Sequence, residues 1–343
     1  MTEVLVFPGD DLVVFDHLAA YGAAAIADAA GYSDMRIRWT DALEPHLELS
    51  GVSWPDLADA VHRHATAHAE PSSWVSADGI TGEGVSGLFS PRVKGMSDEA
   101  NARWYSDRSA AVDRLHDEWA ALDLAMIGAL GAPSYWSRDN GDARPDYGAS
   151  RWEMKTRNRG EDFVRNRLRL LARSVSSRTT DAVEAGLRGL TVVDEVGKGE
   201  AGSRTSTGLM PPTPTDNARA WCALWGISQF AVTARPTGAS HTVGHAGHHL
   251  GGFFYLPAMA RPWPLSRLRT VLRSRQLRAV ATEGLGLRAD ADISTADLAT
   301  AWAWLVDRGA ICVVRFSVHR SDNLSAPEKW AERGERLTPG RYR

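Results

Sequence analysis

The stretch of residues 151–178 constrains this chain more than any other part of its sequence. It contains nine lysines and arginines against three acidic residues. Four apolar residues recur at i, i+4, i+7 and i+11, the spacing of one stripe along a helix, and three arginines recur at i, i+4 and i+8 on another face. We therefore predict a helix from about residue 161 that packs one face on a core. The other face presents guanidinium groups suited to phosphate oxygens, or is simply solvated. The apolar residues are Val164, Leu168, Leu171 and Val175, and the arginines are Arg165, Arg169 and Arg173.

The formal net charge of −3 hides a strong asymmetry between the two ends of the chain. Residues 1–150 contain 10 lysines and arginines against 24 acidic residues, a net of −14, whereas residues 151–343 contain 29 against 18, a net of +11. Such asymmetry favours contact between the basic half and a polyanion, and mutual attraction of the two halves is the alternative. We expect an acidic N-terminal α/β region over residues 1–140 and a basic C-terminal α+β region over residues 151–343, as two domains or as parts of one.

Short apolar runs scattered among amphipathic stretches predict an α+β fold. Asp16 is the expected N-cap of a helix that Gly31 ends. No apolar run approaches the roughly 18 residues of a membrane span, the first residues lack a secretory pattern, and two cysteines form no disulfide framework, so we expect a cytoplasmic protein. Strands are expected at residues 4–7, 35–40, 190–193, 226–234 and 310–318, and helices at residues 17–30, 57–68, 98–130 and 217–225.

Basic residues outside the central stretch extend the predicted nucleic-acid surface. The segment after Pro264 carries several arginines and no acidic residue as far as Arg278. Two long loops, residues 78–97 and 197–216, add isolated cations, and loops of such length are often functional. The supporting candidates are Lys155, Arg157, Arg159, Arg267, Arg269 and Arg273, with Arg92, Lys94 and Arg204 as loop contacts.

One short motif suggests a metal-dependent nuclease as an alternative. Asp146 follows a proline, and Glu153 and Lys155 come soon after it. This is the order of the PD…ExK signature of restriction-like nucleases, in which two carboxylates hold Mg²⁺ and a lysine positions the attacking water. The interval is tight for the usual hairpin and such triplets are common, so the nuclease remains the alternative to a protein without catalytic activity.

Four histidines lie close together in a glycine-rich segment. Histidines at i and i+4 on a helix can bind zinc, but the glycines argue against a helix and no cysteine or acidic residue completes the set. We therefore expect a flexible polar loop, and we predict neither a metal nor a cofactor. Residues 203–208 group hydroxyls beside Arg204 and could hold phosphates, although they lack the end of a P-loop. The histidines are His241, His245, His248 and His249.

Blocks of the sequence carry a resemblance to a known family. The opening DHLAAYGAAAIADAAG is similar to the N-terminal signature of large-subunit proteins of type I CRISPR surveillance (Cascade) complexes. The blocks WEMKTRNRGEDFV and SRTSTGLMPPTPTDNARAWCALWGISQF resemble proteins encoded beside CRISPR genes in actinobacteria, of the U/G-like subtype, and the closing ICVVRFSVHRSDNLSAPEKW fits as well. None of these blocks is a catalytic motif.

The resemblance implies a non-catalytic, DNA-binding subunit. In that family the large subunit lies beside the 5′ end of the guide RNA, recognises a protospacer-adjacent motif on double-stranded DNA, holds the opened strands of the R-loop and recruits a helicase–nuclease. We therefore expect guide RNA, target DNA and other Cascade subunits as partners, with Arg165, Arg169 and Arg173 on phosphates. Besides the nuclease, the alternative is a structural subunit that binds only guide RNA and partner proteins. The chain is short for the family and shows no evident C-terminal helical bundle, which leaves the need for a separate small subunit open.

Overall fold

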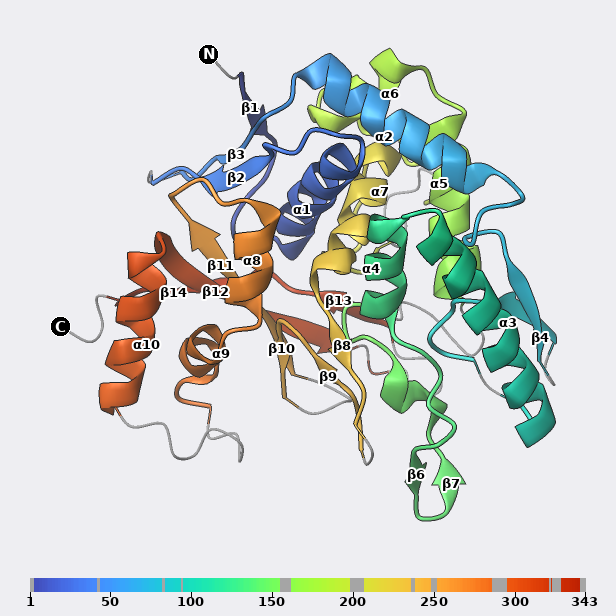
Figure 1. Ribbon diagram of the computed structural model, residues 1–343. Coiled ribbons are helices and arrows are strands. Elements are labelled where there is room, and N and C mark those ends of the chain that lie inside the picture. The colour runs from blue at the N-terminus through green and yellow to red at the C-terminus, as the bar shows by residue number, and fades with distance from the viewer. Residues whose placement is uncertain are drawn as a thin grey trace.

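The computed structural model describes residues 3–41, 44–81, 84–93, 95–154, 162–197, 207–235, 238–247, 252–285, 295–320, 322 and 328–339. Helices and short antiparallel sheets alternate along these residues (Figure 1). The predicted α+β class is therefore confirmed.

Two helices in direct backbone contact form the centre of the molecule. α1 (Val14–Ala29) is buried along nearly its whole length, as its alanine-rich sequence predicts, and α7 (Asn217–Gly226) packs against it (Figure 1). The contact requires glycine on both helices. A Cβ atom added at Gly22 would lie 1.8 Å from the carbonyl oxygen of Cys222, and one at Gly226 would lie 2.2 Å from that of Leu18.

Further helices cover this pair at the top of Figure 1. α2 (Trp54–Ala69) packs against α5 (Arg169–Ser176) and α6 (Thr180–Leu187). Ser53 caps α2 by accepting a hydrogen bond from the backbone N–H of Asp56. The described part of the predicted arginine-rich helix differs from a regular α-helix at its start, because a π-helical turn over Val164–Leu168 precedes α5.

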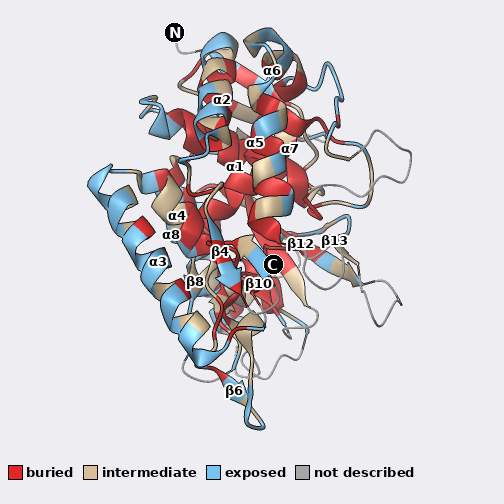
Figure 2. Cartoon of the chain, turned by 90° about the vertical axis from the view of Figure 1, so that its right-hand side faces the viewer, coloured by how far each residue is buried: buried red, intermediate tan, exposed pale blue. Residues whose placement is uncertain are grey.

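The single helix predicted over residues 98–130 is two helices in the structure. α3 (Asp98–Asp117) lies on the outside with much of its surface exposed, whereas the apolar α4 (Ala121–Leu130) turns into the core (Figure 2). The break occurs at Trp119, whose backbone φ of 56° cannot continue a right-handed helix. α3 and α4 bury different faces of the chain. The continuous apolar spacing of residues 98–130 does not reveal this change.

The N-terminal sheet is antiparallel and has the strand order β1–β3–β2. Its strands are β1 (Val4–Phe7), β2 (Arg36–Trp39) and β3 (Leu47–Ser50). Leu47 lies opposite Phe7 on one neighbour and opposite Trp39 on the other, and the alternation of the strands sends all three side chains into the core. The strands predicted at residues 4–7 and 35–40 are confirmed.

The larger sheet contains the C-terminal strands and is also antiparallel, in the order β10–β11–β12–β13, with β14 on β12. Its backbone is joined to the first sheet because Trp263 and Ile37 exchange hydrogen bonds of 2.8 and 3.0 Å. Helices α8, α9 and α10 pack beside it at the lower left of Figure 1. The strands are β10 (His245–Ala246), β11 (Phe253–Met259), β12 (Ala310–Arg320), β13 (Lys329–Ala331) and β14 (Glu335–Leu337). The helices are α8 (Leu265–Leu272), α9 (Arg275–Thr282) and α10 (Thr295–Asp307).

Two-stranded hairpins and short turns lie outside the two larger sheets, some of them at the edges of the molecule (Figure 1). The strand predicted over residues 226–234 is a 3-10 turn, Ile227–Gln229, followed by a two-residue strand. A second 3-10 turn occupies Pro145–Gly148. The hairpins are β4 (Asp78–Thr81) with β5 (Gly84–Gly87), β6 (Arg138–Asp139) with β7 (Asp142–Ala143), and β8 (Val232–Thr233) with β9 (His241–Thr242).

Residues 190–193 do not form the predicted strand. Asp216 accepts a hydrogen bond from the backbone N–H of Val193 at 3.0 Å, and Arg178 donates to the carbonyl oxygen of Val193 at 2.7 Å. Because side chains satisfy these polar groups, the segment needs no sheet partner. Through these two contacts, Val193 connects Arg178, which follows α5, with Asp216 at the start of α7.

The acidic and basic regions share one hydrophobic core and are joined by ion pairs. The prediction that Asp16 is the N-cap of α1 is wrong, because the helix begins one turn earlier with Val13 at the N-cap. Part of the charge asymmetry is therefore neutralised inside the molecule. The ion pairs that join the two regions include Asp16 with Arg219 at 2.5 Å, and Asp10 with Arg333 and Asp11 with Arg336 at 2.6 Å each.

Candidate anion-binding pocket

The predicted row of arginines is partly engaged by the chain itself. Arg169 donates to Oδ1 of Asp78 at 2.7 Å and to the carbonyl oxygen of Val75 at 3.1 Å. Arg165 donates to the carbonyl oxygen of Val85 at 2.5 Å and lies 3.5 Å from the same carboxylate of Asp78. These two arginines therefore fasten the π-turn and α5 to the β4–β5 hairpin.

The remaining predicted cations have different environments. Arg173, Arg267 and Arg273 are exposed. Arg269 donates from Nε to Oε1 of Gln229 at 2.8 Å, and burial lowers its pKa. Lys94, Lys155, Arg157, Arg159 and Arg204 lie outside the described residues.

Arg92 contacts both carboxylates of the nuclease alternative. Its Nε donates to Oε2 of Glu153, and its Nη1 lies 3.7 Å from Oδ1 of Asp146. Burial lowers the pKa of Arg92, but the charges of these two carboxylates outweigh burial and raise it. A guanidinium group thus already pairs with the oxygens that the alternative would use for Mg²⁺. Within the described ranges, no three histidine, cysteine or acidic side chains are grouped in a way that suits a metal ion.

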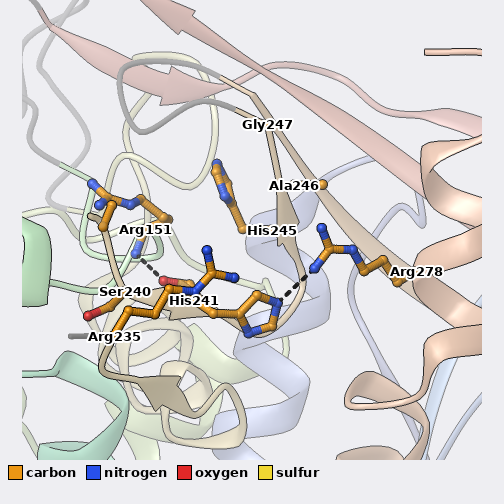
Figure 3. Close-up of a pocket in the computed structure, with 10 residues that line it drawn as sticks. Arg151, Arg235, Ser240, His241, His245, Ala246, Gly247 and Arg278 are labelled. Atoms are coloured by element: carbon orange, nitrogen blue, oxygen red, sulfur yellow. Dashed lines mark hydrogen bonds between the residues drawn. The ribbon is translucent and has the colours of Figure 1, made fainter. Parts of the chain in front are cut away.

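A pocket of about 260 Å³, which we call the cationic pocket, opens between the segment around β9 and β10 and helix α9 (Figure 3). Among the residues that the structure describes, its walls carry three arginines, two histidines and two hydroxyl side chains, and none of these lining residues is acidic. Guanidinium groups bind oxyanions through paired N–H donors, so the walls suit an anionic ligand. The lining residues are Arg151, Arg235, Arg278, His241, His245, Ser240 and Thr242, with Ala239, Ala246 and Gly247.

Arg278 and His241 meet on one wall of the cationic pocket. Nη1 of Arg278 lies 3.2 Å from Nε2 of His241, and Figure 3 shows the arginine reaching the ring from α9. An arginine nitrogen can only donate, so Nε2 accepts and the imidazole is neutral with its proton on Nδ1. Burial lowers the pKa of His241, and the charges of Arg278 and Arg235 lower it further. His241 therefore remains neutral near pH 7, its usual pKa being about 6.5.

Arg151 lies across the opening from Arg278, and the fold fixes its backbone (Figure 3). Its N–H donates to Oγ1 of Thr242 at 3.1 Å. The next residue, Trp152, is fully buried and donates from Nε1 to the carbonyl oxygen of Val243 at 2.7 Å. Burial, with the neighbouring charge of Arg92, lowers the pKa of Arg151 to about 10 against the opposing charges of Asp146 and Glu153. A cation that is buried beside other cations is stabilised when an anion binds.

Further cations adjoin Arg151 and form what we call the flanking cluster. Lys329 on β13 lies opposite Arg320 on β12. Burial, together with the charges of Arg92, Arg320 and Arg151, lowers the pKa of Lys329 to about 8 against the opposing charge of Glu153. Positive charge is therefore concentrated here beyond what the nearby carboxylates neutralise. The flanking cluster consists of Arg92, Arg151, Arg320 and Lys329.

No single sequence pattern predicts the cationic pocket. Arg151 and Arg278 belong to two basic segments that are far apart in the chain, and Arg235 belongs to neither. His241 and His245, expected in a flexible loop, lie on the short strands β9 and β10. Their i, i+4 spacing and the intervening Gly244 (φ 74°) are the local signal that the segment turns and brings both rings to one site. His248 and His249 lie outside the described residues.

Neither a protein-family model nor a curated protein matches the sequence. Among the helices that the structure describes, none combines the length and the apolar character needed to cross a lipid bilayer.

Proposed function

We propose that this protein binds nucleic acid through phosphate groups, with the cationic pocket as the principal contact. The observation that supports this function is the convergence of Arg151, Arg235 and Arg278 on a pocket whose described lining residues include no acidic side chain. Each guanidinium can donate two parallel hydrogen bonds to phosphate oxygens. A bound phosphate would also offset the repulsion among these cations and the flanking cluster.

The more specific role in this proposal is that of a non-catalytic, DNA-binding subunit of a guide-RNA surveillance complex in the cytoplasm. The resemblance of several sequence blocks to Cascade large subunits supports it, and the exposed Arg173, Arg267 and Arg273 supply further phosphate contacts. In that role the chain contacts guide RNA, target double-stranded DNA near the protospacer-adjacent motif, and the other subunits. Base pairing then supplies sequence specificity, while the protein recognises shape and backbone.

The two alternatives differ from this proposal in measurable ways. A nuclease that uses Asp146, Glu153 and Lys155 requires Mg²⁺ to displace the buried guanidinium of Arg92 from its carboxylates. A structural subunit that binds only guide RNA requires no affinity for target DNA.

Binding of the purified chain to labelled double-stranded DNA and to RNA tests the proposal, measured by fluorescence anisotropy across a salt series with and without Mg²⁺. We expect the logarithm of the affinity for duplex DNA to fall with the logarithm of salt concentration, with a slope of about −0.9 per phosphate contact, and no cleavage. Binding to RNA alone supports the structural subunit, and cleavage in Mg²⁺ supports the nuclease. The absence of salt-dependent binding to either polymer contradicts the proposal.

A further inference from the structure

We infer that the cationic pocket is selective for a phosphate monoester, such as the phosphorylated end of a nucleic-acid strand, over the diesters within a strand. This inference rests on the proposed function and names the chemical group that the pocket accepts. The shape of the pocket, its charge and its hydrogen-bond donors each support such a ligand.

The walls of the pocket place donors on more than one side of a bound phosphate group. Arg151, the segment that carries His241 and His245, and Arg278 on α9 border the pocket on different sides (Figure 3). A volume of about 260 Å³ is several times the roughly 30 Å³ that a water molecule takes in the liquid, so a phosphate group fits.

The charge of the pocket also favours a monoester. A phosphodiester carries one negative charge, whereas a monoester carries about 1.5 to 2 at pH 7 because its second pKa is about 6. Arg151, Arg235 and Arg278 line the pocket, and none of its described lining residues is acidic. Lys329 lies near Arg151 and adds to the positive charge, which the carboxylates of Asp146 and Glu153 beside Arg151 offset in part. Since attraction grows with the charge of the ligand, the monoester gains more from this wall than the diester does.

The donors of the pocket match three terminal oxygens, which a monoester has and a diester lacks. Arg235 and Arg278 supply guanidinium donors, and neutral His241 supplies Nδ1–H. Thr242 accepts from the backbone N–H of Arg151 through Oγ1, which leaves its own hydroxyl proton available to donate. Ser240 adds a second hydroxyl to the lining.

Oligonucleotides of one sequence that differ only at their ends test the inference. We expect single strands and duplexes with a 5′- or 3′-phosphate to bind about tenfold more tightly than the same molecules with hydroxyl ends, the effect of one charge-assisted hydrogen bond. Arg278→Gln and, at an exposed position, Arg235→Gln should each reduce this preference. Arg267→Gln, an exposed arginine on α8, is the matched control and should retain it.

The pH dependence of the preference for phosphorylated ends shows whether this preference follows the charge of the ligand or the charge of the protein. The ratio of the two affinities should rise as the pH increases through about 6, where the monoester loses its second proton. Protonation of His241 at low pH would instead strengthen the binding of both ligands, so the affinity of each would rise as the pH falls.

The outcomes distinguish this inference from the function on which it rests. Equal affinity for phosphorylated and hydroxyl ends overturns the inference, while salt-dependent binding of both still supports nucleic-acid binding. Direct binding of inorganic phosphate or a mononucleotide, measured by calorimetry, without binding of any oligonucleotide, supports the monoester pocket and contradicts the nucleic-acid function.

Discussion

Arg92 and Glu153, which are 61 positions apart in the chain, form a buried ion pair in which Nε of the arginine donates to Oε2 of the glutamate. Arg92 also donates to the carbonyl oxygen of Ser150 at 3.4 Å. The pair therefore fixes the segment on both sides of Arg151, which carries one wall of the cationic pocket. The same contact occupies a carboxylate that the nuclease alternative would need.

Glu153→Gln should lower the free energy of unfolding by about 3 kcal/mol, because it leaves Arg92 buried without its main partner. Urea denaturation followed by tryptophan fluorescence measures this change. The control is Asp59→Asn, which removes an exposed i,i+4 pair with Arg63 and should cost about 0.5 kcal/mol or less. Equal effects of the two substitutions would contradict a structural role for the buried pair.

Gly226→Ala should destabilise the protein by about 3 kcal/mol or more, because the added methyl group meets the carbonyl oxygen of Leu18 at the contact of α1 with α7. Gly128→Ala is the matched control. It lies within α4 and an added Cβ meets nothing within 4 Å, so it should be neutral or stabilise by up to about 1 kcal/mol. Thermal denaturation of both variants measures the difference, and tolerance of Gly226→Ala would show that the helices are not in backbone contact.

Local periodicity predicts the elements whose burial depends on one face. Alternation predicts β2, whose side chains are buried and half-buried in turn, and an apolar run predicts the buried strand β12. The helices α2 and α7 are also predicted from their local sequence, because each signal is contained within the element. It fails at Trp119, where the chain changes burial surface within a continuous apolar pattern. It also fails at residues 190–193, whose backbone is satisfied by Arg178 and Asp216 rather than by a strand.

The candidate site depends more strongly on contacts between distant residues. The spacing of Arg165 and Arg169 correctly predicts a shared helical surface. It cannot predict that Asp78, 91 positions away from Arg169, pairs with that side chain. The cationic pocket likewise combines Arg151 with Arg278, and only the folded chain brings their segments together.

The stability of the protein should fall as the pH decreases from about 6.5 to 4, in part because of His17. Burial lowers the pKa of His17 from 6.5 to about 4, so the unfolded chain binds more protons between these values and acid favours unfolding. The whole shift corresponds to about 3 kcal/mol. The difference in free energy of unfolding between the wild type and His17→Gln, measured in urea, should narrow by up to this amount between pH 7 and 4. A difference independent of pH would contradict the buried, neutral state of His17.

Affinity for nucleic acid should weaken as the pH rises through about 8, because Lys329 then loses its charge in the free protein. Burial and the charges of Arg92, Arg320 and Arg151 lower this pKa, and a bound phosphate favours the protonated form, so binding takes up a proton. Fluorescence anisotropy at pH values on either side of 8 measures the effect. Lys329→Arg keeps its charge and should abolish the dependence. An identical pH profile in that variant would exclude Lys329 as its source.

The most direct measurement compares the salt dependence of duplex DNA binding for two triple variants, with their folding checked by circular dichroism. One is Arg151→Ala/Arg235→Ala/Arg278→Ala in the cationic pocket, and the other is Arg165→Ala/Arg169→Ala/Arg173→Ala along the π-turn and α5. We expect the pocket variant to reduce the slope by about 0.9 for each lost contact and the second variant by about 0.9 in total, because Asp78 holds Arg165 and Arg169. A wild-type slope in the pocket variant would contradict the cationic pocket as the principal phosphate contact.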